Sequence, residues 1–377
     1  MSPSISADAC RPWFACPGGC GLVVTSLVRP AAEQAAHGQP NYSGTHCCLA
    51  CQNGEGRHNE DWGCAGVPRC NFLEVPLCPE AGVGNGTGGI GETVLDNCAA
   101  HCIVHIPDSK EAQSSGAPAV LFLHGGVTYV YPETLWWDVR DLISNNTVVR
   151  EQFVVIAPFA TAGEPLAVVS STREKTDRFG QTVAYVDDFD EEKVWNVFLS
   201  ACVSLGPGRV DMSRLHAVGY SMGGQGVWNL AAHQGSRLAS AVPFAGCCSW
   251  RGLHWGMEDA VFRELRDLPI RCYNGEADTG THPWRDIAWL AARRGFSEEA
   301  TKKSTESHAD EGVELSVHEW GDSLQLCLVR GTQSAHCCWD VVLHNEASFG
   351  LFSWMAGLRR SPAQAQCNAA GGTIADG

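Results

Sequence analysis

Beyond residue 100 the chain alternates short apolar runs with segments of helical periodicity. Helical spacing of apolar residues is clearest over Glu191–Leu205 and Met222–His233. Strands that are apolar throughout are buried on both faces, and their alternation with helices is typical of a parallel sheet covered on both sides. We therefore predict an α/β domain with its ligand site at the carboxyl ends of the strands. The predicted strands are Cys102–Ile106, Ala119–Leu123, Phe153–Ala157, Leu215–Gly219, Ala239–Phe244, Ile270–Tyr273 and Leu315–Trp320.

Composition divides the chain near residues 79–92. This stretch, PEAGVGNGTGGIGE, is rich in glycine and predicts a flexible linker. Eleven of the 19 cysteines fall within the first 102 residues, and a small region that buries little apolar surface is often held by disulfides or metal. We predict a small Cys-rich N-terminal region over 1–92, the α/β domain over 93–362 and a disordered tail over 363–377.

Charge and hydropathy limit the partners that this chain can have. A formal net charge of -16 argues against nucleic acid or an anionic membrane as the main partner. No apolar run of about 18 residues occurs, so we expect no membrane span. The first residues carry no evident signal peptide, which favours the cytoplasm. The Cys-rich front leaves a secreted or lumenal location open, and three N-x-S/T sequons do not settle the compartment.

The most informative motif is Gly219-Tyr220-Ser221-Met222-Gly223-Gly224, which places a serine inside G-x-S-x-G. It stands between the predicted strand that ends at Gly219 and the helical run that begins at Met222. A nucleophile on a sharp strand-to-helix turn has strained backbone angles, and small flanking residues let the turn close. The motif predicts Ser221 as the nucleophile of a hydrolase.

A serine nucleophile needs a base, and the base needs an acid that holds its tautomer. In this class the chain order is Ser, then acid, then His. Asp278 fits the acid because it follows the strand at Ile270–Tyr273, where a turn carries a carboxylate to the active end of the sheet. Glu276, two residues closer to the strand, is the rival.

Three late histidines are candidates for the base. His318 lies within the alternation SVHEW and is expected in a strand. His336 follows the last strand and the loop GTQSA and opens a helical stretch, which is where a sheet-end loop would deliver an imidazole. His344 stands two turns further along that helix. We take His336 as the base, with His344 as the alternative.

The tetrahedral intermediate of acyl transfer needs preset donors for its oxyanion. One donor is expected from the backbone N–H of Met222, directly after the nucleophile. The other is expected from the loop after the strand AVLFLHGG, at Gly126 or Val127, where the two glycines of HGG let the backbone approach the substrate.

The segments LFLHGG, VVIAPFA, GRVDMSRLHAVGYSMGGQGVWNLAAHQGSRLASAVPFAG, NGEADTG and HCCWD together resemble the esterase branch of the α/β-hydrolase superfamily, over about residues 100–360. Within that branch the chain resembles polyhydroxybutyrate-depolymerase-like and feruloyl-esterase-like carboxylesterases and, more distantly, prolyl-oligopeptidase catalytic domains. The resemblance implies an α/β-hydrolase fold with Ser221, Asp278 and His336 as its triad. The chain departs from the family pattern at two places, Cys337–Cys338 after the base and Cys247–Cys248 after Phe244. Both pairs are expected near the catalytic face, so the resemblance does not establish how the substrate reaches the site.

We therefore expect a serine esterase that cleaves a small-molecule or polymer ester through an acyl-enzyme, without a cofactor. Tyr129, Trp250 and Trp339 are candidates for binding the substrate. A peptidase of the prolyl-oligopeptidase-like type is the nearest rival, since the same triad cleaves amides. From a different class comes a non-catalytic binding protein on a hydrolase scaffold, with the Cys-rich front as its working part.

The Cys-rich front contains one cluster that could bind zinc. Cys48, Cys51, His58 and Cys64 offer thiolate and imidazole ligands, but their spacing matches no established zinc module. A region stapled by disulfides, or one with plain thiols, fits the same residues, and we expect no metal. A lid, a partner-binding module and an N-terminal brace are all compatible with this region.

Overall fold

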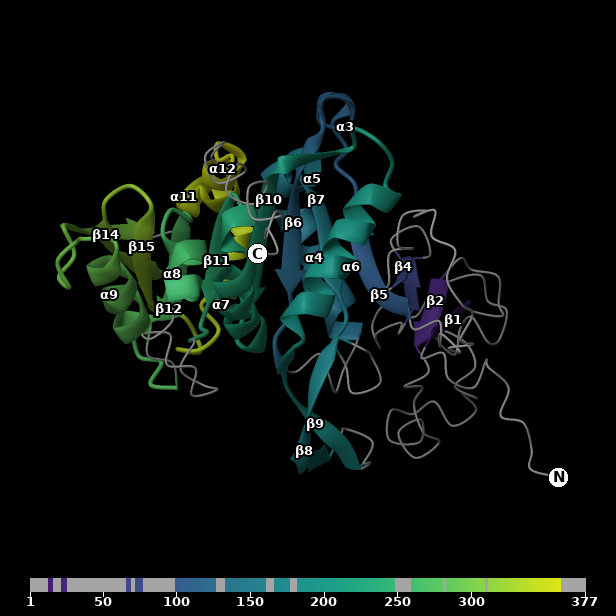
Figure 1. Ribbon diagram of the computed structural model, residues 1–377, viewed down its shortest axis with the longest axis horizontal. Coiled ribbons are helices and arrows are strands. Elements are labelled where there is room, and N and C mark those ends of the chain that lie inside the picture. The colour runs from purple at the N-terminus through teal and green to yellow at the C-terminus, as the bar shows by residue number, and fades with distance from the viewer. Residues whose placement is uncertain are drawn as a thin grey trace, which may run out of the picture.

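The computed structural model of the chain describes residues 13–15, 22–25, 66–68, 72–76, 99–126, 133–160, 166–176, 182–247, 259–280, 283–308 and 311–360. Its centre is a 10-stranded sheet (Figure 1). The strands of this sheet are β4 (Phe72–Pro76), β5 (Ala99–His105), β6 (Ala117–Leu123), β7 (Val154–Pro158), β10 (Val210–Tyr220), β11 (Ser240–Phe244), β12 (Ile270–Gly275), β13 (Lys302–His308), β14 (Val313–Trp320) and β15 (Leu324–Arg330).

The strand order is β13-β14-β15-β12-β11-β10-β6-β7-β5-β4. The six neighbours from β15 to β7 are parallel, whereas β13 and β14 at one edge and β5 and β4 at the other pair antiparallel. The prediction of a mostly parallel sheet is confirmed for this centre. The chain leaves β6 for β7 on one side and later places β10 on the other side. The loops after β6 and β10 therefore meet at a switch point, where open α/β sheets bind ligands.

Helices cover both faces of the sheet, as expected for strands that are apolar throughout. Residues of β6 alternate between the two cores: Leu121 and Leu123 pack in one cluster, and Val120 and Phe122 in the other. The first cluster lies under α6 (Glu191–Ser204), α7 (Met222–Gln234), α8 (Asp259–Leu265) and α9 (Pro283–Arg293), the second under α4 (Glu133–Asn145), α5 (Thr147–Gln152), α10 (Trp339–His344), α11 (Glu346–Phe349) and α12 (Leu351–Ala356).

Local sequence signals fix where several helices begin. The Asp190 side chain accepts a hydrogen bond from the N–H of Lys193 at 3.1 Å and caps α6. Asn146 caps α5 in the same way through the N–H of Val149. The helical stretch predicted after His336 is divided into α10, α11 and α12. Gly350, with φ of 55°, separates α11 from α12 because it adopts the left-handed conformation.

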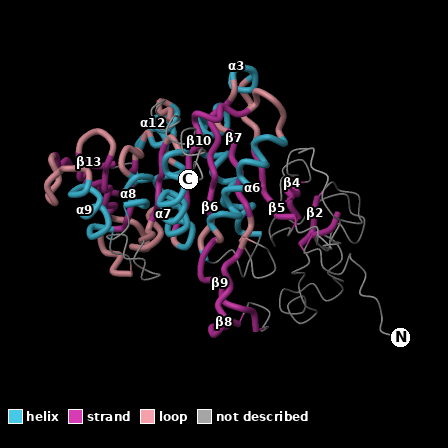
Figure 2. Tube along the Cα trace, in the orientation of Figure 1, coloured by secondary structure: helices cyan, strands magenta, loops and turns pink. Residues whose placement is uncertain are grey.

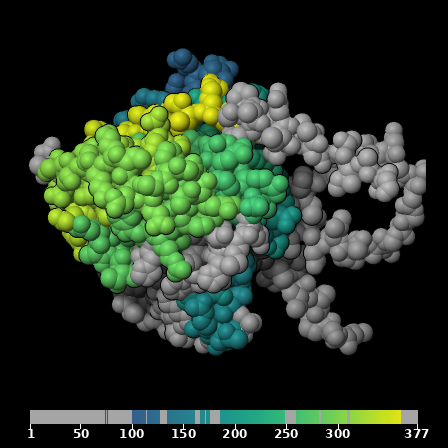
Figure 3. All heavy atoms as spheres, turned by 60° about the vertical axis from the view of Figure 1, so that its left-hand side comes forward, coloured from purple at the N-terminus to yellow at the C-terminus, as the bar shows by residue number. Residues whose placement is uncertain are grey.

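A two-stranded hairpin of β8 (Ala167–Thr176) and β9 (Thr182–Phe189) extends beyond the sheet (Figures 1 and 2). It lies at the opposite end of the molecule from α3 (Lys110–Ser115), which directly precedes β6. Since β6 starts beside α3, the hairpin stands at the carboxyl ends of the parallel strands. Figure 3 shows its teal atoms protruding at the bottom of the molecule.

The N-terminal part contributes a separate three-stranded antiparallel sheet of β1 (Trp13–Ala15), β2 (Leu22–Thr25) and β3 (Gly66–Pro68). The Gly-rich linker at 79–92 and the tail at 363–377 lie outside the described residues, and the domain boundaries stay predictions. Among the helices in the described ranges, none combines the length and the hydropathy that crossing a membrane requires. The 3-10 turn η5 (Gly235–Arg237) follows α7 and leads into β11.

Candidate active site

Ser221 stands on the sharp turn between β10 and α7 with φ of 55° and ψ of -118°. A positive φ is uncommon for a residue other than glycine and here marks backbone strain at the turn. The N–H of Ser221 donates to the carbonyl of Phe244 at 2.9 Å, which ties the turn to the end of β11. This is the geometry that the G-x-S-x-G motif predicts.

The glycines around Ser221 are required by close backbone contacts. A Cβ on Gly219 would lie 2.5 Å from the carbonyl oxygen of Gly223, and one on Gly223 would lie 2.0 Å from that of Leu123. No Cβ atom tolerates such distances, so the turn can pack against β6 only without side chains at these positions. The strand order and this elbow together decide the architecture. The chain has an α/β-hydrolase-like fold.

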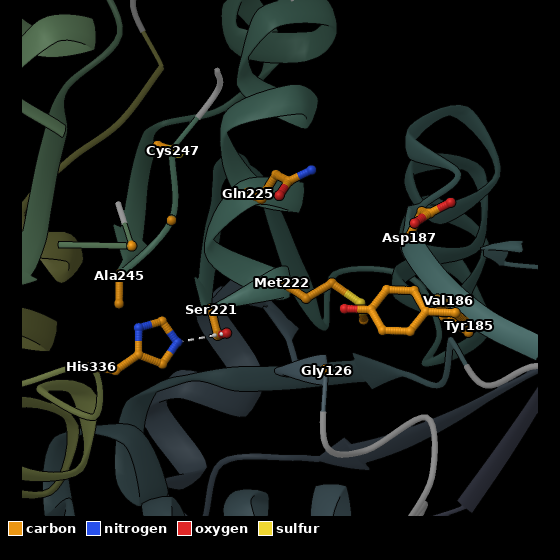
Figure 4. A pocket seen from close by; sticks show the side chains of 12 residues that line it. Gly126, Tyr185, Val186, Asp187, Ser221, Met222, Gln225, Ala245, Cys247 and His336 are labelled. Carbon is orange, nitrogen blue, oxygen red and sulfur yellow. Dashed lines mark hydrogen bonds between the residues drawn. The ribbon is translucent and has the colours of Figure 1, made fainter. Parts of the chain in front are cut away.

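A hydrogen-bonded relay joins the three residues that the sequence singled out. Nε2 of His336 lies 2.9 Å from Oγ of Ser221 (Figure 4). Nδ1 of the same imidazole lies 2.7 Å from Oδ2 of Asp278. The Asp278 side chain is 8% exposed, whereas that of His336 is 42% exposed. Asp278 is thus shielded from solvent, whereas the imidazole of His336 is partly exposed beside Ser221.

Asp278 reaches the imidazole because the strand end and the histidine loop pack closely. The N–H of Asp278 donates to the carbonyl of Gly275, the last residue of β12, at 3.0 Å. A Cβ on Gly275 would lie 1.6 Å from the carbonyl oxygen of Ala335, so the loop that carries His336 rests on the bare backbone of Gly275. The rival acid, Glu276, points elsewhere and binds Arg330.

The other candidate bases do not contact Ser221. His318 lies in β14, as predicted, and packs edge-on against Trp284 with ring centroids 4.6 Å apart. His344 is the last residue of α10, and burial lowers its pKa. The relay therefore singles out His336 among the three.

The loop after β6 is held by a histidine that the sequence reasoning did not assign. His124 is fully buried, and burial lowers its pKa to about 4, so its ring is neutral. Nε2 accepts from the N–H of Ala160 at 3.0 Å, which leaves the proton on Nδ1 to donate to the carbonyl of Gly125 at 2.9 Å. His124 is the first residue of the HGG motif, but the motif does not indicate its contact with Ala160, which is 36 positions away.

Two backbone segments face Ser221 as possible oxyanion donors. Met222 begins α7, so its N–H has no acceptor inside the helix and lies at the positive end of the helix dipole. Gly126 lines the same pocket as Ser221 and Met222. Val127, the other candidate from this loop, lies outside the described residues.

The pocket beside Ser221 has a volume of about 300 Å³. One wall comes from β9 of the protruding hairpin, through Tyr185, Val186 and Asp187, and the side chain of Met222 of α7 packs against this wall (Figure 4). Arg173 of β8 supports that wall, since its guanidinium lies 4.3 Å from the Tyr185 ring centroid and pairs with Asp187. The remaining lining residues are Gly126, Ser221, Gln225, Ala245, Gly246, Cys247, Gly280 and His336.

A buried carboxylate ties this hairpin to the nucleophile helix. Asp188, at the end of β9, is fully buried, and its Oδ2 accepts from Nε2 of Gln225 at 2.8 Å and from Nδ2 of Asn229 at 2.7 Å. Its Oδ1 accepts from the N–H of Phe189 at 2.8 Å. No local sequence pattern indicates this cluster, because Asp188 lies 37 positions from Gln225 and 41 from Asn229.

The predicted aromatic contacts fall in two groups. Trp339 is not among the pocket-lining residues and instead packs edge-on against His336, with ring centroids 5.4 Å apart. Tyr129 and Trp250 lie outside the described residues.

Of the two cysteine pairs, the members that the structure describes lie near the catalytic face, as the sequence led us to expect. Cys247 lines the pocket, while Cys337 and Cys338 directly follow His336. Cys338 is fully buried, which raises the pKa of its thiol well above the usual range. Cys248 lies outside the described residues, as do the zinc candidates Cys48, Cys51, His58 and Cys64; within the described ranges no group of three or more potential metal ligands occurs.

Solved esterase structures resemble this chain at low sequence identity. A thermostable esterase shares 17% identity at a TM-score of 0.43 over 77% of this chain, which spans 64% of that protein's length. An acetyl xylan esterase from Aspergillus awamori shares 17% identity at 0.41, over 67% of this chain and 94% of that one. Est1E from Butyrivibrio proteoclasticus shares 11% at 0.39, over 69% and 96%. No protein-family model and no curated protein sequence matches the chain.

Proposed function

We propose that this protein is a serine hydrolase that cleaves carboxylic esters. The observation that carries the proposal is the relay from Ser221 through His336 to Asp278, on a strained elbow that opens into a pocket. A serine becomes a nucleophile when a base within hydrogen-bond reach removes its proton and a third group orients that base. Both distances fall in the range of 2.6–3.2 Å that such transfers need.

In the proposed reaction, Oγ of Ser221 attacks the ester carbonyl while Nε2 of His336 takes the hydroxyl proton. Asp278 accepts from Nδ1–H, which keeps Nε2 available as the base and stabilises the imidazolium that forms. The N–H groups of Met222 and of Gly126 meet the charge on the carbonyl oxygen. The imidazolium then protonates the departing alcohol, and water, activated by the same histidine, releases the acid from Ser221.

The size of the pocket favours a substrate with one small group beside the reacting carbonyl. A cavity of about 300 Å³ lies at the lower end of the range for small-molecule sites. The side chains of Tyr185, Met222 and Cys247 are among those that line it. We therefore infer that short acyl esters are cleaved faster than long-chain ones.

Hydrolysis of p-nitrophenyl esters tests this function. We expect the wild-type protein to hydrolyse the acetate and butyrate faster than the decanoate, and Ser221→Ala to lose at least about 10³-fold in kcat. Ser353→Ala, at an exposed position on α12, is the matched control and should retain wild-type kcat. Equal rates for wild type and Ser221→Ala would reject the proposal.

A further inference from the structure

Tyr220, the residue before the nucleophile, links two of the loops around the active site. It ends β10, and its side chain belongs to the core cluster on the face opposite α7. The side chain is almost fully buried, and its ring contacts the loop after β6 on one side and the start of α10 on another.

The loop after β6, which contains Gly125 and Gly126 and is called the oxyanion loop below, lies directly on the ring of Tyr220. A Cβ on Gly125 would lie 2.5 Å from Cε2 of Tyr220 and 2.9 Å from its Cδ2. The backbone of Gly125 is therefore in van der Waals contact with the aromatic face, at the position before Gly126. The ring sets how closely this loop approaches Ser221.

The loop that carries the base is supported by the same ring. Trp339 stacks on Tyr220 with centroids 4.5 Å apart and planes inclined by 22°. The imidazole of His336 in turn stands edge-on to Trp339, with planes inclined by 89°. Packed aromatic pairs of this kind fix orientation as well as distance. The tilt of His336 thus depends on a stack that begins at Tyr220.

The hydroxyl of Tyr220 anchors the stack to helix α4. It donates a hydrogen bond to Oδ2 of Asp138. Asp138 has the negative charges of Asp141 on α4 and Asp340 on α10 nearby, and burial raises its pKa to about 6. A half-buried carboxylate beside two others disfavours folding, so packing alone does not account for an aspartate at this position.

We propose that Tyr220, anchored by Asp138 and stacked on Trp339, is a positioning residue that sets the oxyanion loop and His336 at their working distances from Ser221. The inference rests on the proposed function and deepens it. In this proposal Tyr220 contacts neither the substrate nor the proton that passes from Ser221 to His336, and it acts through Gly125 and Trp339. Loosening the stack lowers the rate of the chemical step and leaves substrate affinity nearly unchanged, because misplacement of a catalytic group by about 1 Å reduces rates by up to about a hundredfold.

The test compares kcat and KM for p-nitrophenyl acetate, normalised to active sites titrated with a fluorophosphonate. Tyr220→Phe keeps the ring but loses the anchor, and Trp339→Leu removes the stack. We expect kcat to fall about tenfold in each, with KM changed less than about twofold. Trp339→Phe restores an aromatic face and should recover most of the loss. Asp138→Asn keeps an acceptor for the hydroxyl and should retain most of kcat, unlike Asp138→Ala.

The controls separate failure of this inference from failure of the proposed function. Inactive Ser221→Ala with wild-type kcat in Tyr220→Phe would overturn the positioning role and leave the esterase in place. Active Ser221→Ala would reject the function itself. If Trp339→Leu does not fold, Tyr220→Phe, which changes one buried oxygen, decides the question. A loss of thermal stability in Tyr220→Phe with unchanged kcat and labelling rate also counts against positioning.

Discussion

At the scale of single residues, the site depends on positions where a side chain is forbidden. Gly219, Gly223 and Gly275 each lie against a carbonyl oxygen, and together they bring Ser221 to β6 and His336 to β12. These contacts explain why the positions two residues before and two residues after the nucleophile must be glycine. The strained φ of Ser221 is maintained by the surrounding backbone, which has no room to relax.

Adding one methyl group at Gly223 should therefore disable the protein. Its Cβ would meet the backbone oxygen of Leu123, which cannot move without disturbing β6. We expect Gly223→Ala to lower the free energy of unfolding by about 3 kcal/mol or more and to abolish activity. Gly357→Ala, whose Cβ would make an ordinary contact of 3.5 Å, should change stability by less than about 0.5 kcal/mol. Thermal unfolding of both variants checks this, and comparable loss in both would contradict it.

The two acids after β12 should differ sharply in their effect on catalysis. In Asp278→Asn the amide oxygen keeps the N–H of Gly280 and the NH2 group faces Nδ1 of His336, so the ring presents the wrong tautomer to Ser221, and kcat should fall by about 10⁴-fold. Glu276 binds Arg330 at an exposed site, so Glu276→Gln should keep kcat and lower stability by less than about 1 kcal/mol. Steady-state kinetics on both variants measures the contrast. A larger loss in Glu276→Gln would reverse the assignment.

The raised pKa of Asp138 predicts how stability varies with pH. An acid that holds its proton more tightly in the folded state makes folding less favourable as pH rises from about 4 to about 6, and the loss persists above that range. Asp138→Asn removes the charge, so we expect the variant to be more stable than wild type by about 1–3 kcal/mol at pH 8 and equal to it near pH 4. Denaturant unfolding across this range checks the prediction. Parallel curves for the two proteins would contradict it.

Sequence reasoning at this scale succeeded where a residue type follows a motif or a strand end. Ser221, Asp278 and His336 were singled out in this way, and the structure brings them together, although their catalytic roles stay predictions. His124 and Asp138 were missed. Their partners, Ala160 and Tyr220, are 36 and 82 positions away, and no local pattern in a single sequence reports such pairings.

At the scale of elements, apolar runs located five of the six parallel strands, because a strand covered on both faces is apolar along its whole length. The sixth parallel strand, β15, was not among the predicted strands. The hairpin β8–β9 was not predicted. Its residues are mostly polar and mixed in charge, which is typical of a loop, yet β9 provides a wall of the pocket. The edge strand β13 was not predicted either, because its residues are also polar.

The attachment of this hairpin to α7 should depend on Asp188. Asp188→Ala leaves the amides of Gln225 and Asn229 buried without their acceptor, so we expect a loss of about 3 kcal/mol in stability. Asp187→Asn is the matched control, because the neighbouring Asp187 pairs with the half-exposed Arg173. Its free energy of unfolding should fall by less than about 1 kcal/mol. Denaturant unfolding of the two variants measures the difference, and equal losses would mean that the buried cluster does not hold the hairpin.

At the scale of the whole molecule, topology gathers the site from distant parts of the sequence. The switch point between β6 and β10 brings the HGG loop beside the elbow, and the neighbouring strands β11 and β12 add Phe244 and Asp278 at the same edge. The Cys-rich front has no assigned role in this arrangement, and its boundary at 79–92 stays a prediction.

The central claim is that Ser221 is an activated nucleophile, and covalent labelling tests it most directly. Wild-type protein, Ser221→Ala and Ser353→Ala would be treated with a fluorophosphonate, and the labelled site located by mass spectrometry of the intact protein and of its peptides. We expect one label per chain, on the peptide that contains Ser221, in wild type and Ser353→Ala, and none in Ser221→Ala. Unreactive wild-type protein, or a label that persists in Ser221→Ala, would contradict it.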